Sequence, residues 1–305
     1  FLPFPRNLLF GLAARGRGIH VKLAQKPNVL PFLDFLRKVP LGPPAVEGNP
    51  PGPEEGAVVQ YTGGASGSPK GVVLTHRNLT ANVLQACSWF NHWKRGKEVF
   101  FSLLPCHQAL GMTLAVNLPI YLAAGAIHQP RFDPVQFLNT VKAEGPSAFP
   151  AVPSMIEALA WNPTLGKYRV SGIEAYFSIG PALPAEVREN FEKKTGRRVI
   201  EGYGLTEASP LTHMNPQLGV RKPRSMGIPL PDTEAKIVDP RDGRTELEPG
   251  KTGELLVRGP QVMKGYWNRP DETARALREG WLHTGDLAWM DEDGFFYYVD
   301  KMKKT

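Results

Sequence analysis

Cysteine is scarce in this chain: Cys87 and Cys106 are the two that occur in 305 residues. They lie far apart and lack the spacing of metal ligands, which argues against a disulfide framework or a zinc site. The N-terminal residues also lack the layout of a secretory signal peptide. A reducing, cytoplasmic setting fits these absences best.

Long hydrophobic runs are also few, and one uncharged run comes close to membrane-spanning length. Residues 109–127 are 19 residues without a formal charge. Asn117 and Pro119 lie in the middle of this run, and Gly111 and Gly125 lie near its ends. These residues favour a buried helix, a break and a buried strand over a transmembrane helix. Peripheral membrane contact is left open.

Acidic residues are fewer than basic ones, 29 against 36, which leaves a formal net charge of +7. This balance suits anionic ligands such as nucleotides, coenzyme A or acidic lipid surfaces. It also permits nucleic-acid binding, but no run of the sequence interleaves basic and aromatic residues, so we expect no nucleic-acid partner. The length permits a large core and two substructures.

Helix and strand patterns alternate through the middle of the chain. This rhythm predicts an α/β sheet with crossover helices. A strand, a glycine-rich loop, a second strand and the first helix are interpreted as the start of that layer. The helices are expected at residues 78–93, 134–144, 153–160 and 184–195, and the strands at residues 99–104, 148–152, 174–179 and 198–201.

The pattern changes after residue 226, where short strands are separated by turn residues. These strands, at residues 235–238, 253–258 and 294–299, predict a small β-barrel-like subdomain with one helix at residues 270–277. We therefore divide the chain into a proline-rich lead-in (residues 1–55), an α/β subdomain (56–226) and the β-barrel-like subdomain (227–299). Two short helices are expected in the lead-in, at residues 7–14 and 32–39.

A polar, glycine-rich segment, residues 60–71, separates two apolar runs. Its glycines allow the backbone to approach a ligand closely, and its hydroxyl groups, successive N–H groups and Lys70 together suit a polyphosphate. The usual P-loop pattern cannot be laid over it. Read alone, the segment is equally compatible with a surface turn.

A second segment, residues 201–210, places the hydroxyl of Thr206 beside the carboxylate of Glu207 in a glycine-flanked loop. This arrangement suits one oxygen on a phosphate and one on Mg²⁺, which takes carboxylates alongside nucleotide oxygens. Taken alone, the segment is more often a structural turn.

Together these segments resemble the adenylate-forming enzymes, the acyl-CoA synthetase and luciferase group. Residues 61–71 resemble the family's Tyr-Thr-[Ser/Gly]-Gly-Thr-Thr-Gly-x-Pro-Lys-Gly, with Ala65 and Ser66 in place of the two threonines. Residues 203–207 match Tyr-Gly-x-Thr-Glu, and residues 280–286 match Gly-Trp-x-x-Thr-Gly-Asp. Residues 178–184 resemble the turn whose backbone lines the adenine pocket. Within this group, the chain most resembles the long-chain fatty-acid–CoA ligases.

The resemblance implies roles for individual residues. Lys70, Thr206 and Glu207 would assist the reaction, Glu207 as the Mg²⁺ ligand. Gln108, which stands where the family has a histidine, and Gly111 would lie near the carboxylate substrate. Nucleotide contacts are implied for Thr62, Gly63, Gly64, Ala65, Ser66, Gly67, Lys70, Gly180, Pro181, Gly202, Tyr203, Gly204, Thr206, Asp286 and Lys301.

The implied reaction is ATP-dependent activation of a fatty acid to an acyl-adenylate and then to acyl-CoA, with Mg²⁺ as cofactor and coenzyme A as co-substrate. Two alternatives stay open: adenylation of a different carboxylic acid, or a nucleotide-binding module without turnover. The chain would cover the latter part of the family's large domain, with residues 300–305 at the hinge to a C-terminal domain. For this chain we therefore expect nucleotide binding at best, with little or no thioester formation. A homodimer is left open.

Overall fold

The computed structural model describes residues 49–62, 69–168 and 170–302. The chain divides after residue 50 into two units, and nearly all of the described residues belong to the second, residues 51–305. The short helices expected at residues 7–14 and 32–39 lie outside the described residues. Within the described ranges, every helix is too short or too polar to span a bilayer.

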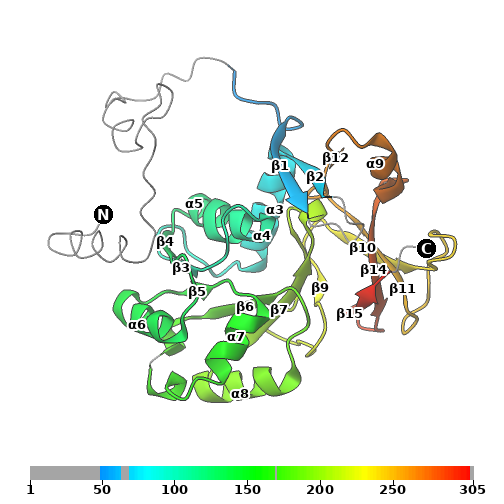
Figure 1. The fold of residues 1–305 in the computed structure, drawn as a ribbon. Helices are drawn as coiled ribbons and strands as arrows, with labels where there is room; N and C mark the ends of the chain where they lie inside the picture. The colour runs from blue at the N-terminus through cyan, green and yellow to red at the C-terminus, as the bar shows by residue number, and fades with distance from the viewer. Residues whose placement is uncertain (1–48, 63–68, 169, 303–305) are drawn as a thin grey trace. The chain divides into compact units, whose positions relative to one another are not determined.

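The largest sheet has seven strands in the order β4-β3-β5-β6-β7-β8-β9 (Figure 1). Strands β4, β3, β5, β6 and β7 are parallel, whereas β8 and β9 pair antiparallel at one edge. The predicted α/β layer is therefore present. The strand bounds are β3 Val99–Ser102, β4 Gly125–His128, β5 Ala148–Phe149, β6 Ala175–Ile179, β7 Val199–Gly204, β8 Leu211–Met214 and β9 Ile228–Pro229.

Helices alternate with these strands, as the sequence pattern predicts. The helices predicted at residues 134–144 and 153–160 have those bounds. The helix expected from residue 78 begins two residues earlier, because Thr75 caps it. The Thr75 hydroxyl accepts a hydrogen bond from Asn78 N at 3.1 Å, and the Asn78 side chain accepts one from Thr75 N at 2.9 Å. The helices are α3 His76–Trp89, α6 Pro134–Glu144, α7 Pro153–Ala160 and α8 Ala185–Thr195, with short 3₁₀ turns η2 Leu165–Lys167, η3 Val170–Gly172 and η4 Thr206–Ala208.

The core lies on both faces of the seven-stranded sheet because successive strand residues point to opposite sides. Phe101, Phe149 and Tyr176 pack in one buried cluster with side chains of α6, α7 and α8. Their neighbours Phe100, Ala148 and Phe177 pack in a second cluster with α3. Figure 1 shows these two groups of helices on opposite sides of the strands. The sheet is thereby held rigid between two helical layers.

The uncharged run forms a helical stretch followed by a strand. It contains α4 Ala109–Gly111, the π-helix η1 Met112–Asn117 and α5 Leu118–Tyr121, which precede β4. The helical stretch is partly buried, as expected, but the prediction of a buried strand was wrong. Three of the four β4 residues are exposed, because β4 lies at the edge of the sheet and has a single neighbouring strand.

The first two strands lie outside the α/β layer. β1 Gly56–Thr62 and β2 Lys70–Thr75 form an antiparallel pair, and β12 Gly265–Tyr266 pairs with the other edge of β2. The interpretation of these strands as the start of the α/β layer was therefore wrong. The short connection between them allows a hairpin, whereas parallel neighbours need a longer crossover.

A five-stranded antiparallel sheet follows in the last third of the chain. Its order is β10-β11-β14-β13, with β15 also paired to β14, so its described strands form an open sheet rather than a closed barrel. One short helix, α9 Pro270–Ala276, accompanies them. The strand bounds are β10 Glu234–Val238, β11 Gly253–Arg258, β13 Leu277–Arg278, β14 Trp281–Met290 and β15 Phe296–Lys301.

Candidate active site

A pocket of about 320 Å³ opens at the carboxyl ends of the parallel strands. Strands β6 and β7 end there, and Gln108 lies there at the start of α4. Ligands of open α/β sheets bind at this edge, because loops from successive strands converge on it. The lining residues are Gln60, Tyr61, Thr62, Gln108, Ala109, Leu110, Ile179, Gly180, Gly204, Leu205, Thr206 and Pro210.

Five of the predicted site residues therefore meet at one pocket although they come from four separate segments. They are Thr62, Gln108, Gly180, Gly204 and Thr206. Eight other predicted residues among those described stand apart from its lining. Gly111 and Gly202 are buried, Pro181 is exposed, and the remaining five are Lys70, Tyr203, Glu207, Asp286 and Lys301. The predicted contacts of Gly63, Gly64, Ala65, Ser66 and Gly67 lie outside the described residues.

Gly204 lets the loop after β7 fold tightly beside the pocket. A Cβ atom at this position would lie 2.3 Å from the carbonyl oxygen of Pro210. That carbonyl accepts a hydrogen bond from Leu205 N at 3.0 Å, which closes the loop. Because Thr206 and Glu207 lie within this loop, a side chain at position 204 would displace both.

Asp286 is buried where the five-stranded sheet meets β7, with 4% of its surface exposed. Its Oδ2 atom accepts a hydrogen bond from the Tyr203 hydroxyl at 2.5 Å, and its Oδ1 atom lies 2.7 Å from Lys301 Nζ. Burial, together with the charge of Asp286, raises the pKa of Tyr203 well above its usual value, so the phenol remains a donor. Three residues predicted to contact the nucleotide are thus joined directly.

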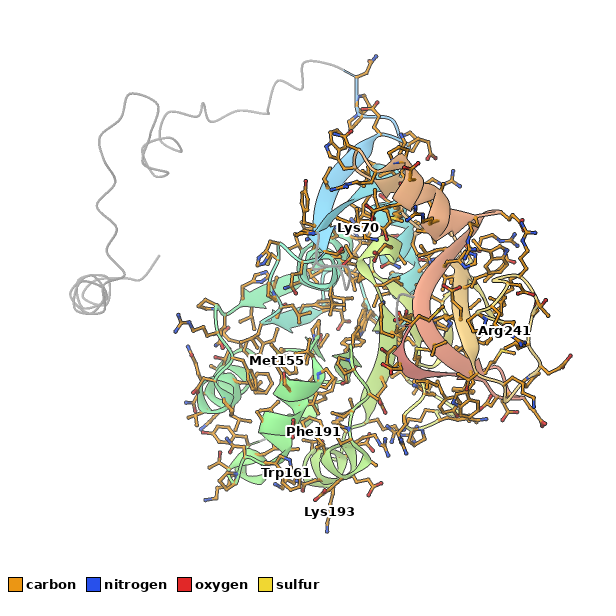
Figure 2. All side chains as sticks on the ribbon, turned by 45° about the vertical axis from the view of Figure 1, so that its right-hand side comes forward. Lys70, Met155, Trp161, Phe191, Lys193 and Arg241 are labelled. Atoms are coloured by element: carbon orange, nitrogen blue, oxygen red, sulfur yellow. The ribbon has the colours of Figure 1, made fainter. Side chains whose placement is uncertain are left out.

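Lys70 and Glu207 are linked through a residue to which the sequence assigned no role, Tyr266. The Tyr266 hydroxyl donates to Glu207 Oε1 at 2.9 Å, and Lys70 Nζ lies 4.3 Å from the centre of the Tyr266 ring. Lys70 also lies 3.3 Å from Glu272 Oε2. Figure 2 shows Lys70 where the first strands meet α9. The sequence signal at this position is the Gly-Tyr-Trp run of residues 265–267, which stands between the motif that holds Glu207 and the motif that ends at Asp286.

Comparison with known protein families also supports a nucleotide site. The sequence profile of the family described as "AMP-binding enzyme" matches residues 16–267. The chain belongs to the AMP-binding enzyme family. The predicted resemblance to this family is confirmed.

Among curated proteins of the family, the chain is 41% identical to a long-chain-fatty-acid–CoA ligase of Bacillus subtilis (strain 168), over 99% of this chain and 54% of that protein. It is 40% identical to a ligase of the same name from Escherichia coli O157:H7, over 82% of this chain and 45% of that protein. It is 33% identical to 4-coumarate-CoA ligase 2 of Narcissus pseudonarcissus, over 83% of this chain and 46% of that protein. The chain thus spans about half the length of these AMP-binding relatives.

The fold of this chain is similar to the folds of solved structures of such enzymes. ATP-bound MatB from Rhodopseudomonas palustris has a TM-score of 0.77 at 32% identity, over 82% of this chain and 49% of that chain. The long-chain-fatty-acid-CoA ligase FadD1 from Archaeoglobus fulgidus has a TM-score of 0.73 at 29% identity, over 82% of this chain and 52% of that chain. The described residues therefore have part of the fold of AMP-binding, adenylate-forming enzymes.

The donor set at Glu207 fits the Mg²⁺ that such enzymes would use with a nucleotide. No group of three or more metal-ligating side chains gathers anywhere in the described ranges, so a site built from protein ligands alone is absent from them. Mg²⁺ does not need one, because it keeps several waters and takes one or two carboxylates together with phosphate oxygens. Glu207 supplies such a carboxylate directly after the pocket-lining Thr206.

Proposed function

We propose that this chain is the nucleotide- and acyl-binding part of an ATP-dependent ligase that converts a long-chain fatty acid to its acyl-CoA. The convergence of Thr62, Gln108, Gly180, Gly204 and Thr206 on one pocket carries the proposal. The 41% and 40% identity to long-chain-fatty-acid–CoA ligases supports the substrate class.

The reaction takes place in two steps. A carboxylate oxygen of the fatty acid attacks the α-phosphorus of ATP, forming a P–O bond while the bond to the leaving pyrophosphate breaks. The sulfur of coenzyme A then attacks the acyl carbon, forming the thioester and releasing AMP; the thiol proton leaves to solvent. Bound Mg²⁺ would neutralise phosphate charge. No nucleophile on the protein is required, so rate acceleration rests on positioning and on charge neutralisation.

The residues of this chain would divide that work. Thr206 donates to the α-phosphate, Glu207 holds Mg²⁺ and Lys70 adds a positive charge beside the phosphates. Asp286 accepts hydrogen bonds from the ribose hydroxyls, which are charge-assisted and therefore strong. Gln108, which lines the pocket, would lie near the carboxylate of the fatty acid. The cytoplasmic location, peripheral membrane contact and homodimer stay predictions.

For the carboxylic acid substrate, one observation supports a second candidate. The similarity to 4-coumarate-CoA ligase 2, at 33% identity, favours an aryl acid as the second candidate substrate. ATP-dependent release of pyrophosphate from the complete protein separates the two: we expect it with long-chain fatty acids. Release with 4-coumarate alone would replace the first candidate by the second.

Isothermal titration of the 305-residue chain with Mg·ATP, and with a non-hydrolysable acyl-adenylate mimic, tests the site directly. We expect saturable binding that Asp286→Ala abolishes and that the control Asp271→Ala, at an exposed position of α9, leaves unchanged. Absence of binding by the unsubstituted chain would overturn the proposal for this chain. Unchanged binding by Asp286→Ala would instead place the ribose elsewhere.

A further inference from the structure

Backbone hydrogen bonds hold Tyr266 in place. It pairs with Val72 in the β2–β12 ladder, and its N–H donates to Thr273 Oγ1 at 2.9 Å. The neighbouring Trp267 N–H donates to Gly71 O at 2.7 Å. The phenol therefore projects from the short strand β12, whose backbone is paired with β2.

The same segment also holds the turn that carries Glu207. Met263 N–H donates to the backbone carbonyl of Glu207 at 2.8 Å, and Lys264 N–H donates to Val73 O at 3.0 Å. Residues 263–267 thus connect the Glu207 turn to β2, where Lys70 is the first residue. A change in the geometry of this segment would move the acidic and the basic residue together.

The Tyr266 side chain contacts both of those residues through different groups. Its hydroxyl donates to Glu207 Oε1, which engages one of the two carboxylate oxygens. Its ring lies beneath Lys70 Nζ, an arrangement in which the negative face of the ring attracts the ammonium group.

We propose that Tyr266 is a positioning residue that aligns Glu207 for Mg²⁺ and Lys70 for the phosphates of ATP. This inference rests on the proposed function. The hydroxyl orients Glu207 and the ring supports Lys70, so the two parts of one side chain serve the metal and the phosphates separately.

Glu272 is a further partner of Lys70. Its carboxylate lies 3.3 Å from Lys70 Nζ, and the two side chains are 31% and 17% exposed. A polyphosphate carries more negative charge than one carboxylate, so it would compete with Glu272 for the Lys70 ammonium group.

Tyr266→Phe tests the hydroxyl because it preserves the ring. ATP binding to the 305-residue chain is measured by isothermal titration over a series of Mg²⁺ concentrations, and AMP binding is measured without Mg²⁺. We expect Tyr266→Phe to raise the half-saturating Mg²⁺ concentration by about tenfold or more, the effect of one lost hydrogen bond to a charged group. AMP affinity should change less than about twofold, because AMP does not need the metal contact.

Two further variants separate the roles of the ring and the hydroxyl. Tyr266→Leu removes the ring as well and should also weaken ATP binding without Mg²⁺, whereas Tyr298→Phe, at a tyrosine that is 40% exposed, should leave both titrations unchanged. An unchanged Mg²⁺ dependence in Tyr266→Phe, or an equal loss of AMP binding, would overturn the inference while the proposed function stands. Absence of ATP binding by the unsubstituted chain would overturn both.

Discussion

The hydroxyl of Tyr203 donates a hydrogen bond to Asp286 Oδ2 across 2.5 Å, which joins β7 of the seven-stranded sheet to β14 of the five-stranded sheet. Both residues are buried, at 7% and 4% exposure. The contact therefore fixes the predicted ribose-binding carboxylate relative to the pocket-lining residues at the end of β7.

Removing this hydrogen bond should destabilise the fold. Tyr203→Phe leaves a buried carboxylate oxygen without its donor, so we expect the free energy of unfolding to fall by about 1–3 kcal/mol. Urea unfolding should show a lower midpoint at an unchanged slope.

The double variant Tyr203→Phe/Asp286→Ala supplies the control for that contact. Because the two side chains touch, the loss of unfolding free energy in the double variant should differ from the sum of the losses in the two single variants. The difference should be roughly 0.5–3 kcal/mol. Strictly additive losses would show that the hydrogen bond contributes nothing to stability.

Gly204→Ala should damage nucleotide binding more than it damages the fold. Its Cβ atom would lie 2.3 Å from Pro210 O, so the loop with Thr206 and Glu207 must shift. A displacement of this kind can cost up to about a hundredfold in function, and we expect at least about a tenfold weaker Mg·ATP affinity by isothermal titration. Gly166→Ala is the matched control, because nothing lies within 4 Å of a Cβ there. Equal affinity in the two variants would contradict this prediction.

His213 should make stability depend on pH. It is buried on β8 between the rings of Tyr203 and Phe296, its Nδ1 lies 2.9 Å from Thr212 Oγ1, and burial lowers its pKa from 6.5 to about 3. Below pH 6.5 the unfolded chain binds a proton that the folded chain excludes, so this contribution to stability is present above pH 6.5 and is lost as the pH falls toward 3.

Urea unfolding between pH 5 and 7.5 measures this effect. Below the pKa of His213 in the unfolded chain, the wild-type free energy of unfolding should fall by up to about 1.4 kcal/mol for each unit by which the pH is lowered. In His213→Asn this contribution should be missing. The exposed His128→Asn should keep the wild-type slope. A slope that survives in His213→Asn would assign the pH dependence to other groups.

Phe137 should be among the most sensitive core positions. Its ring is fully buried, stacks on Phe101 at 5.0 Å and lies 4.5 Å from Phe149. Phe137→Ala should lower the free energy of unfolding by about 3–5 kcal/mol, from lost burial and the cavity left behind. Val135→Ala, on the same helix at 52% exposure, should change it by less than about 0.5 kcal/mol. Similar losses in thermal unfolding of both variants would contradict the assigned core.

Local sequence determined the elements whose signals lie within a few residues. Helix α6 has the predicted bounds because Asp133 accepts a hydrogen bond from Gln136 N at 2.7 Å, Pro134 fits the first helical position, and Gly145 ends the helix at a φ of 57°. The motifs likewise indicated the pocket-lining Gly180, Gly204 and Thr206, because the chemistry of each short loop can be read from its residues.

Strand partners and side-chain partners were decided by the tertiary structure alone. Periodicity predicted β1, β2 and β4 as strands but not that β1 and β2 leave the α/β layer or that β4 is an edge. The Tyr266–Glu207 bond spans 59 residues and the Tyr203–Asp286 bond spans 83. Contacts at such separation leave no local pattern, because they depend on which sheet edges meet after the chain has folded. The sequence by itself thus determined which chemical groups the site contains, and the fold decided which of them touch.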